Sequence, residues 1–182
     1  MRRRAAGRHA VSTIIEGMET ARASRLRMAL DWIPATLAVL MIVFESTATM
    51  SASNTSAWLY PLWVRLFGPM SPGRWAVVHH LIRKTGHFVG YGTVSVAFFY
   101  SWRQTLRQFG RRHWSLWRRA AALAVLCTLI VASLDEYHQS FLPSRTSSPY
   151  DVLLDFCGAI LGQLLLLALL QMTSWRPRYE AA

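Results

Sequence analysis

The sequence predicts an all-α fold: a polytopic membrane helical bundle with about four transmembrane helices and an interfacial amphipathic segment. Apolar residues make up 53% of the 182 residues. They gather in four stretches that approach the roughly 20 residues that a helix needs to cross a hydrocarbon core. The basic residues gather in the polar segments around those stretches. A soluble bundle of this size would rarely bury four such helices and also carry eight Trp, so the soluble class is disfavoured.

The first predicted span runs from about Trp32 to Thr49 and follows an Arg-rich, unpatterned tail, residues 1–27, with a short helix near Thr13–Arg22. Small residues after this span resemble the cleavage site of a signal peptide. The basic region before the span is longer than such peptides carry, so we predict an uncleaved anchor.

The second predicted span runs from about Gly86 to Trp102 and is the least apolar, with three glycines, one His and several hydroxyls. Small and polar residues suit a helix that is buried among other helices. The preceding segment, Met50–Lys84, is rich in Trp and Tyr, which favour the headgroup level. Within it, "AWLYPLWVRLFG" predicts a short amphipathic helix on the membrane surface, and "PGRWAVVHHLIRK" predicts a second one that leads into the span.

The third predicted span runs from about Arg119 to Leu134, and the fourth, from about Val152 to Met172, is the most apolar. Cys127 and Cys157 fall inside these two spans. We expect both thiols to act as small packing residues, and no disulfide is predicted.

The net charge of +11 comes almost entirely from Arg. A basic chain can bind nucleic acid, but the location of the charge indicates membrane topology instead. Seven basic residues precede the first span, six lie between the second and third, two follow the fourth, and five lie in the remaining connections. This positive-inside pattern puts both termini in the cytoplasm. We therefore predict cytoplasmic tails at 1–27 and 175–182, a membrane domain at 28–174, and membrane lipids rather than nucleic acid as partners.

Polar side chains recur at the predicted outer ends of three spans, each set on one helix face. They are Arg83, Lys84, His87 and Tyr91 on the second span, Asp135, Glu136 and Gln139 on the third, and Asp151 and Asp155 on the fourth. Gly158 and Gly162 continue the face of the last two acids as a small-xxx-small pattern, which lets another helix approach closely. The topology puts all three faces on the same extracytoplasmic side, so the sequence predicts one polar site there, which Arg145 of the neighbouring connection joins.

An ionised side chain at bilayer depth costs about 2.5–3.5 kcal/mol, so the acids need partners. Arg83, Lys84, Arg145 and a charged His87 are available, and the turn "SRTSSPYD" is expected to place Asp151 near Arg145. One alternative is that these charges form only structural salt bridges between helices.

Three chemistries fit the polar site: acid–base catalysis, anion binding and metal binding. The catalytic candidates are His87, Asp135 and Glu136. The ligand-binding candidates are Arg83, Lys84, Tyr91, Gln139, Arg145, Asp151 and Asp155. No spaced His pair supports a metal ion and none is predicted; the sequence identifies no cofactor. A serine nucleophile is open among Ser133, Ser140 and Ser144, but no local signature marks one.

Three blocks, "RKTGHFVGY", "DEYHQSFLPSR" and "DVLLDFCGAILG", together resemble the signature of VanZ-like membrane proteins in order and spacing, over about Arg83 to Gly162. The resemblance implies a multi-pass protein of the bacterial cytoplasmic membrane that is associated with resistance to the glycopeptide antibiotic teicoplanin. It implies a class of phenotype and no particular reaction.

The function that this resemblance implies is binding or altering a cell-envelope component, such as a cell-wall precursor or a glycopeptide, at the outer face. Two alternatives stay open. One is an integral-membrane enzyme that acts on a phosphate-bearing lipid or glycan headgroup, and the other is a structural membrane assembly factor.

Overall fold

The computed structural model describes residues 2–108 and 113–174, and across them the chain folds into helices joined by short connections. Neither described stretch contains a strand, and the predicted all-α class is confirmed. The helices are α1 (Arg2–Asp31), α2 (Ile33–Glu45), the 3₁₀ turn η1 (Ala48–Met50), α3 (Ala52–Phe67), α4 (Pro72–Arg107), α5 (His113–Gln139) and α6 (Pro149–Ser174).

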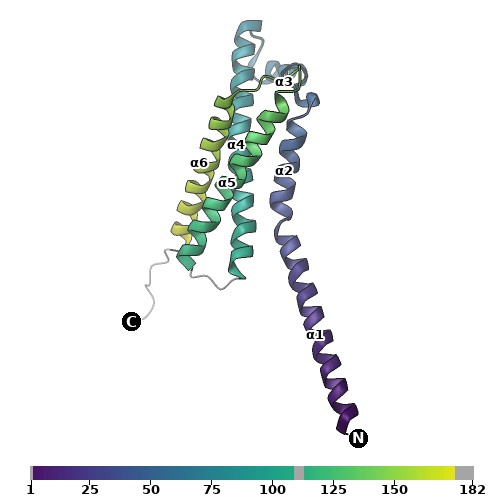
Figure 1. Cartoon of the computed structure of the whole chain (residues 1–182). Coiled ribbons are helices and arrows are strands. Elements are labelled where there is room, and N and C mark those ends of the chain that lie inside the picture. The colour runs from purple at the N-terminus through teal and green to yellow at the C-terminus, as the bar shows by residue number, and fades with distance from the viewer. Residues whose placement is uncertain (1, 109–112, 175–182) are drawn as a thin grey trace, which may run out of the picture.

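α4 lies at the centre of the bundle and packs against α2, α5 and α6 (Figure 1). Its buried Tyr91, Val94, Phe98 and Phe99 form the core with alanines of α2 and α5. Lipid tails are as apolar as these side chains, so close van der Waals packing over small residues holds such helices together. The expectation that the least apolar span is enclosed by other helices is confirmed.

Within residues 2–108 and 113–174, three helical segments are long and apolar enough to cross a membrane: 17–45, 115–139 and 149–172. They contain all of the third and fourth predicted spans. They also contain the first predicted span except its last residues, which follow Glu45. α4, which contains the second predicted span, is not one of the three. The protein is therefore a helical membrane protein. The predicted number of about four spans is reached when α4 is added to these three segments.

The N-terminal segment differs from the prediction. α1 is helical from Arg2 to Asp31, whereas the sequence predicted an unpatterned tail with a short helix near Thr13–Arg22. Ala, Arg and Met are strong helix formers, and the first proline is Pro34, at the start of α2. Nothing in the sequence ends the helix before that proline, so α1 continues almost directly into α2 and extends well beyond the rest of the bundle (Figure 1).

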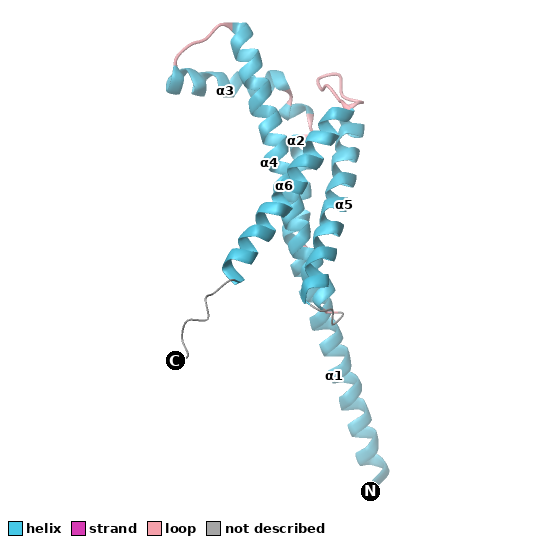
Figure 2. Cartoon of the chain, turned by 90° about the vertical axis from the view of Figure 1, so that its left-hand side faces the viewer, coloured by secondary structure: helices cyan, strands magenta, loops and turns pink. Residues whose placement is uncertain are grey.

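α3 confirms the predicted short helix after the first span, and it lies across the long axis of α4 (Figure 2). The Ser51 hydroxyl caps its first turn, and Gly68 ends it with a φ of 86°, a conformation that favours glycine. The Trp75 indole donates a hydrogen bond to the Ser56 hydroxyl at 2.7 Å and fastens α3 to α4. The segment "PGRWAVVHHLIRK" forms the first turns of α4 itself, because nothing after Pro72 interrupts the helix.

The small-xxx-small stripe of α6 lies directly against another helix, as predicted, and that helix is α4. A Cβ atom added at Gly158 would overlap the backbone carbonyl of Phe88, and one added at Gly162 would lie 2.8 Å from the carbonyl oxygen of Gly92. Only glycine allows the two backbones to come this close. The crossing therefore fixes which residues of α4 and α6 face each other in the turns beside it.

Candidate functional site

The predicted site residues lie together at one end of the bundle. This end, where α3 and the α5–α6 connection lie, is called the α3 end; it is opposite the N-terminal end of α1 (Figure 1). α4 runs away from it, α5 returns to it and α6 runs away again. The site thus combines the first half of α4, the last turn of α5 and the first turns of α6, three segments that lie far apart in the sequence.

Asp135 is held by two neutral donors. The Tyr91 hydroxyl of α4 donates to Asp135 Oδ2 at 2.8 Å, and Gln139 Nε2 donates to the same oxygen at 2.9 Å from one turn further along α5. All three side chains are buried. Asp135 therefore links α4 to α5 through a hydrogen-bonded network that fixes its position.

Glu136 lies beside Asp135 but faces the start of α6. Its Oε2 accepts a hydrogen bond from the backbone N–H of Ser148 at 3.0 Å, and its backbone carbonyl accepts one from the Ser147 hydroxyl at 2.8 Å. Helix N-termini favour a carboxylate. The other carboxylate oxygen, Oε1, is buried and has no hydrogen-bond partner among the described residues. One oxygen of Glu136 is thus anchored while the other faces the interior of the bundle.

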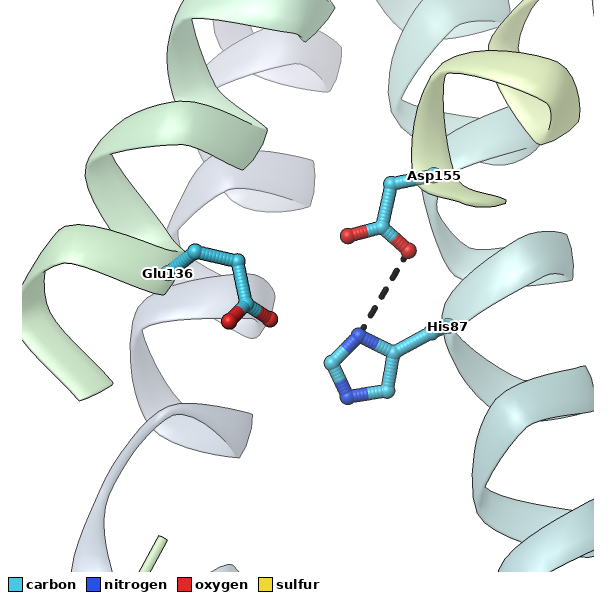
Figure 3. A group of neighbouring side chains, drawn as sticks. All are labelled: His87, Glu136 and Asp155. Atoms are coloured by element: carbon cyan, nitrogen blue, oxygen red, sulfur yellow. Dashed lines mark ion pairs between the residues drawn. The ribbon is translucent and has the colours of Figure 1, made fainter. Parts of the chain in front are cut away.

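His87 of α4 faces Asp155 of α6 (Figure 3). His87 Nδ1 lies 3.6 Å from Asp155 Oδ1, and the Asp155 side chain is completely buried. Neither oxygen of Asp155 accepts a hydrogen bond from any residue that the structure describes. The two residues stand one turn or less from the glycine crossing described above, which is the reason that they meet.

Glu136 approaches this pair from α5 (Figure 3). One possible ligand atom from each of His87, Glu136 and Asp155 lies within 4.8 Å of the others. Each residue comes from a different sequence block, so no local spacing in the sequence could have revealed the group. Among the described residues, these three could hold a metal ion.

Lys84 and Asp151 form an ion pair between α4 and the first turn of α6. This corrects the expectation that Asp151 lies near Arg145. The Arg145 guanidinium instead donates to the backbone carbonyl oxygens of Glu45 and Thr47. The last carbonyls of a helix lack intrahelical partners and attract cations, so Arg145 is drawn to the end of α2.

Arg145 lies outside the membrane-spanning segments and is half-buried. Burial lowers the pKa of its guanidinium, and the nearby carboxylates of Asp135, Glu136 and Glu45 raise it. An arginine with such neighbours stays charged at neutral pH. Its Nε is buried and has no hydrogen-bond partner in the described part of the chain.

A cavity of about 230 Å³ opens beside Arg145 at the α3 end. Its polar lining includes Arg83, Arg145, His79 and His87, with Glu45 as the one acid. Its apolar lining consists of Met50, Trp58, Leu59 and Ile82. We call this space the cationic cavity. Cationic and neutral hydrogen-bond donors outnumber the single acid in this lining. Together with the apolar side chains, they suit an anion that carries an apolar group.

Arg83 and His79 are fixed by α3 and its preceding turn. Arg83 Nη1 donates to the carbonyl oxygen of Met50 at 2.8 Å, and the Thr55 hydroxyl lies 3.1 Å from His79 Nε2. His79 and Thr55 were not predicted as site residues, because nothing in the sequence pattern shows that α3 folds back over α4. The neighbouring His80 is exposed, because adjacent residues of a helix point in different directions.

None of the candidate serine nucleophiles is hydrogen-bonded to a catalytic base in the part of the chain that the structure describes. The hydroxyls of Ser133 and Ser140 donate to the backbone carbonyls of Leu129 and Tyr137 in their own helix, at 2.8 and 2.6 Å. Ser144 is exposed in the α5–α6 connection. The chemistry of the site therefore centres on its cations, His87 and the carboxylates.

The comparison with protein families gave one match: the model of a family described as VanZ/LLP1 matches residues 17–171, which is most of the chain. The comparisons with curated proteins and with solved structures gave no match. The matched residues include every helix that contributes to the site.

Proposed function

The chain belongs to the VanZ/LLP1 family, and we propose that it binds, or acts on, the anionic headgroup of a cell-envelope component at the outer face of the bacterial cytoplasmic membrane. The observation that carries this proposal is the cationic cavity, which is lined by two arginines together with apolar side chains. Guanidinium groups bind phosphate and carboxylate through paired hydrogen bonds. A cell-wall precursor or a glycopeptide such as teicoplanin would present such a group.

The geometry supports an amphiphile in particular. Trp58 and Leu59 belong to α3, which lies across the end of the bundle and exposes further large apolar side chains, among them Leu62, Leu66 and Phe67. A surface helix of this kind sits at the boundary between headgroups and acyl chains. A ligand could therefore keep its apolar part in the lipid while its charged group enters the cavity.

A direct test measures thermal melting of the detergent-solubilised protein with dioctanoyl phosphatidic acid and with dioctanoyl phosphatidylcholine. We expect the anionic lipid to raise the melting temperature by roughly 5 °C near saturation, and the zwitterionic lipid to raise it far less. Arg145→Gln keeps hydrogen-bond donors for the α2 carbonyls but removes the charge, and it should abolish the difference. Arg107→Gln, at the opposite end of α4, is the matched control. Equal shifts with both lipids would count against an anion site.

We also propose that the α3 end faces outward and that both ends of the chain lie in the cytoplasm. The support is the distribution of basic residues along the sequence. Together with the helix order, it predicts that Ser53 and Ser144 are extracytoplasmic and that Ser115 is cytoplasmic.

Single cysteines at these three positions test the orientation. The two native thiols are free, so Cys127 and Cys157 are first replaced by alanine. In intact cells, or in spheroplasts where an outer membrane is present, a membrane-impermeant maleimide should label Ser53→Cys and Ser144→Cys. It should label Ser115→Cys only after lysis. The reverse pattern would place the site in the cytoplasm.

The second candidate function is an enzyme that acts on a phosphate-bearing lipid or glycan headgroup. It is favoured by the position of His87, which lines the cationic cavity and also faces Asp155 and Glu136. A binding protein should tolerate His87→Gln better than Arg145→Gln. An enzyme should lose turnover of the headgroup on His87→Gln and still bind it. A structural assembly factor would lose accumulation in the membrane on either change.

A further inference from the structure

We propose that His87, Glu136 and Asp155 form a binding site for a divalent transition-metal ion of the Zn²⁺ type. The three side chains come from α4, α5 and α6 and converge on one space (Figure 3). One possible ligand atom from each lies within 4.8 Å of the other two. This goes beyond the proposed headgroup function, since the metal site does not depend on which headgroup is bound.

The separations fit a metal centre after a small movement of one side chain. Metal–ligand bonds of about 2.0–2.2 Å in tetrahedral geometry place the ligand atoms roughly 3.3–3.6 Å apart. His87 Nδ1 and Asp155 Oδ1 already lie at 3.6 Å. Glu136 must move closer to His87 and Asp155 to reach this separation. Its Oε1 can do so without breaking a hydrogen bond to a described residue.

Asp155 lacks the partners that the other acids of the site have. Asp135 accepts hydrogen bonds from Tyr91 and Gln139, Glu136 accepts one from the backbone of Ser148, and Asp151 is paired with Lys84. Asp155 is fully buried, and neither of its oxygens accepts a hydrogen bond from a described residue; one buried oxygen each of Glu136 and Asp135 is likewise unbonded. His87 is too far away to satisfy Asp155 by a normal hydrogen bond. A bound cation would take one oxygen from each of Asp155 and Glu136.

The surroundings would orient the ligands. The backbone N–H of Ser148 holds Glu136 Oε2 at 3.0 Å, and the ring of Tyr91 stacks beside the His87 ring with centroids 6.2 Å apart. Contacts of this kind fix ligand orientation at metal sites. The glycine crossing of α4 and α6 fixes the separation of His87 and Asp155.

The donor set indicates the class of metal. One imidazole nitrogen and two carboxylate oxygens suit Zn²⁺ and related transition metals, whereas Mg²⁺ and Ca²⁺ prefer oxygen ligands alone. Three protein ligands leave one tetrahedral position open for water or for a ligand oxygen. The sequence predicted no metal ion because no spaced His pair is present; here a single His meets acids from two other helices.

The test uses the full chain, purified without a histidine tag, treated with a chelator, equilibrated with Zn²⁺ and desalted. Elemental mass spectrometry should detect one zinc ion per chain. Asp155→Asn and Glu136→Gln should each weaken Zn²⁺ binding by more than about tenfold, since even outer-shell changes cost 10–100-fold. Asp151→Asn removes a carboxylate one turn earlier on α6 and is the matched control, which should keep its zinc.

Two results would overturn the metal site: zinc uptake by the unaltered chain no higher than that of Asp155→Asn, or equal loss of zinc in Asp151→Asn. If Asp155→Asn does not fold, the visible absorption spectrum of Co²⁺ bound to the unaltered chain tests the site instead. Intense visible absorption bands are expected for a tetrahedral site, and weak octahedral bands would contradict the proposal. Arg145→Gln should keep its zinc and lose the response to phosphatidic acid, so the metal site and the headgroup site fail separately.

Discussion

Replacing Gly158 with leucine is expected to destroy the stable bundle. Even a Cβ atom at this position would overlap the backbone carbonyl of Phe88 on α4. Backbone cannot move aside as a flexible side chain can, so α4 and α6 would have to separate along the crossing. Overpacking a well-packed core commonly costs about 1–3 kcal/mol, and we expect a loss at or above the top of that range.

The measurement is the yield of monodisperse protein in detergent together with its melting temperature. Gly73→Leu is the matched control, because a Cβ atom there meets nothing within 4 Å at the start of the same α4. Gly158→Leu should give little folded protein while Gly73→Leu behaves like the unaltered chain. If the two variants melt alike, α6 does not cross α4 at this glycine, and the position of Asp155 against His87 would have to be abandoned.

Glu136→Gln is expected to leave the fold intact and to remove function. Glutamine has nearly the same shape, and its side-chain oxygen can accept the hydrogen bond from the backbone N–H of Ser148, which now lies 3.0 Å from Glu136 Oε2. The start of α6 should therefore keep its position. What is lost is the negative charge that faces His87 and Asp155 from α5.

The assay for this variant is the susceptibility of a bacterial strain, deleted for its own copy, to teicoplanin and to other envelope-acting antibiotics. The strain carrying Glu136→Gln should match the deletion, with protein level and melting temperature unchanged. Glu19→Gln, the same chemical change on the exposed surface of α1, should match the unaltered chain. A stable Glu136→Gln protein with full function would refute the role assigned to this carboxylate.

The sequence predicted the helices of the bundle well because each leaves a local signal. Apolar runs that approach membrane length mark α5, α6 and the segment that contains α2, and the small and polar residues of α4 indicate a helix enclosed by others. The extent of α1 was less predictable. Its residues are ordinary helix formers without an apolar face, so only the position of Pro34 shows where the helix can end.

That these polar residues lie at one end of the bundle was predictable, but which of them pair was not. Helix periodicity put each polar residue on a face, and the glycine stripe showed that one face meets another helix. Which side chains meet depends on the height at which the helices cross. Lys84 rather than Arg145 therefore pairs with Asp151, and Arg145 binds the end of α2 instead. His79 was not predicted, because it lines the cavity only when α3 folds back over α4.

The most direct test of the headgroup proposal is native mass spectrometry of the protein purified from bacterial membranes. The unaltered chain should carry an anionic amphiphile with a phosphate or carboxylate group, identified by fragmentation. The Arg145→Gln and Arg83→Gln variants should lose it, whereas Arg107→Gln should retain it. An anionic amphiphile that remains equally bound to all of these variants, or its absence from the unaltered chain, would contradict the account.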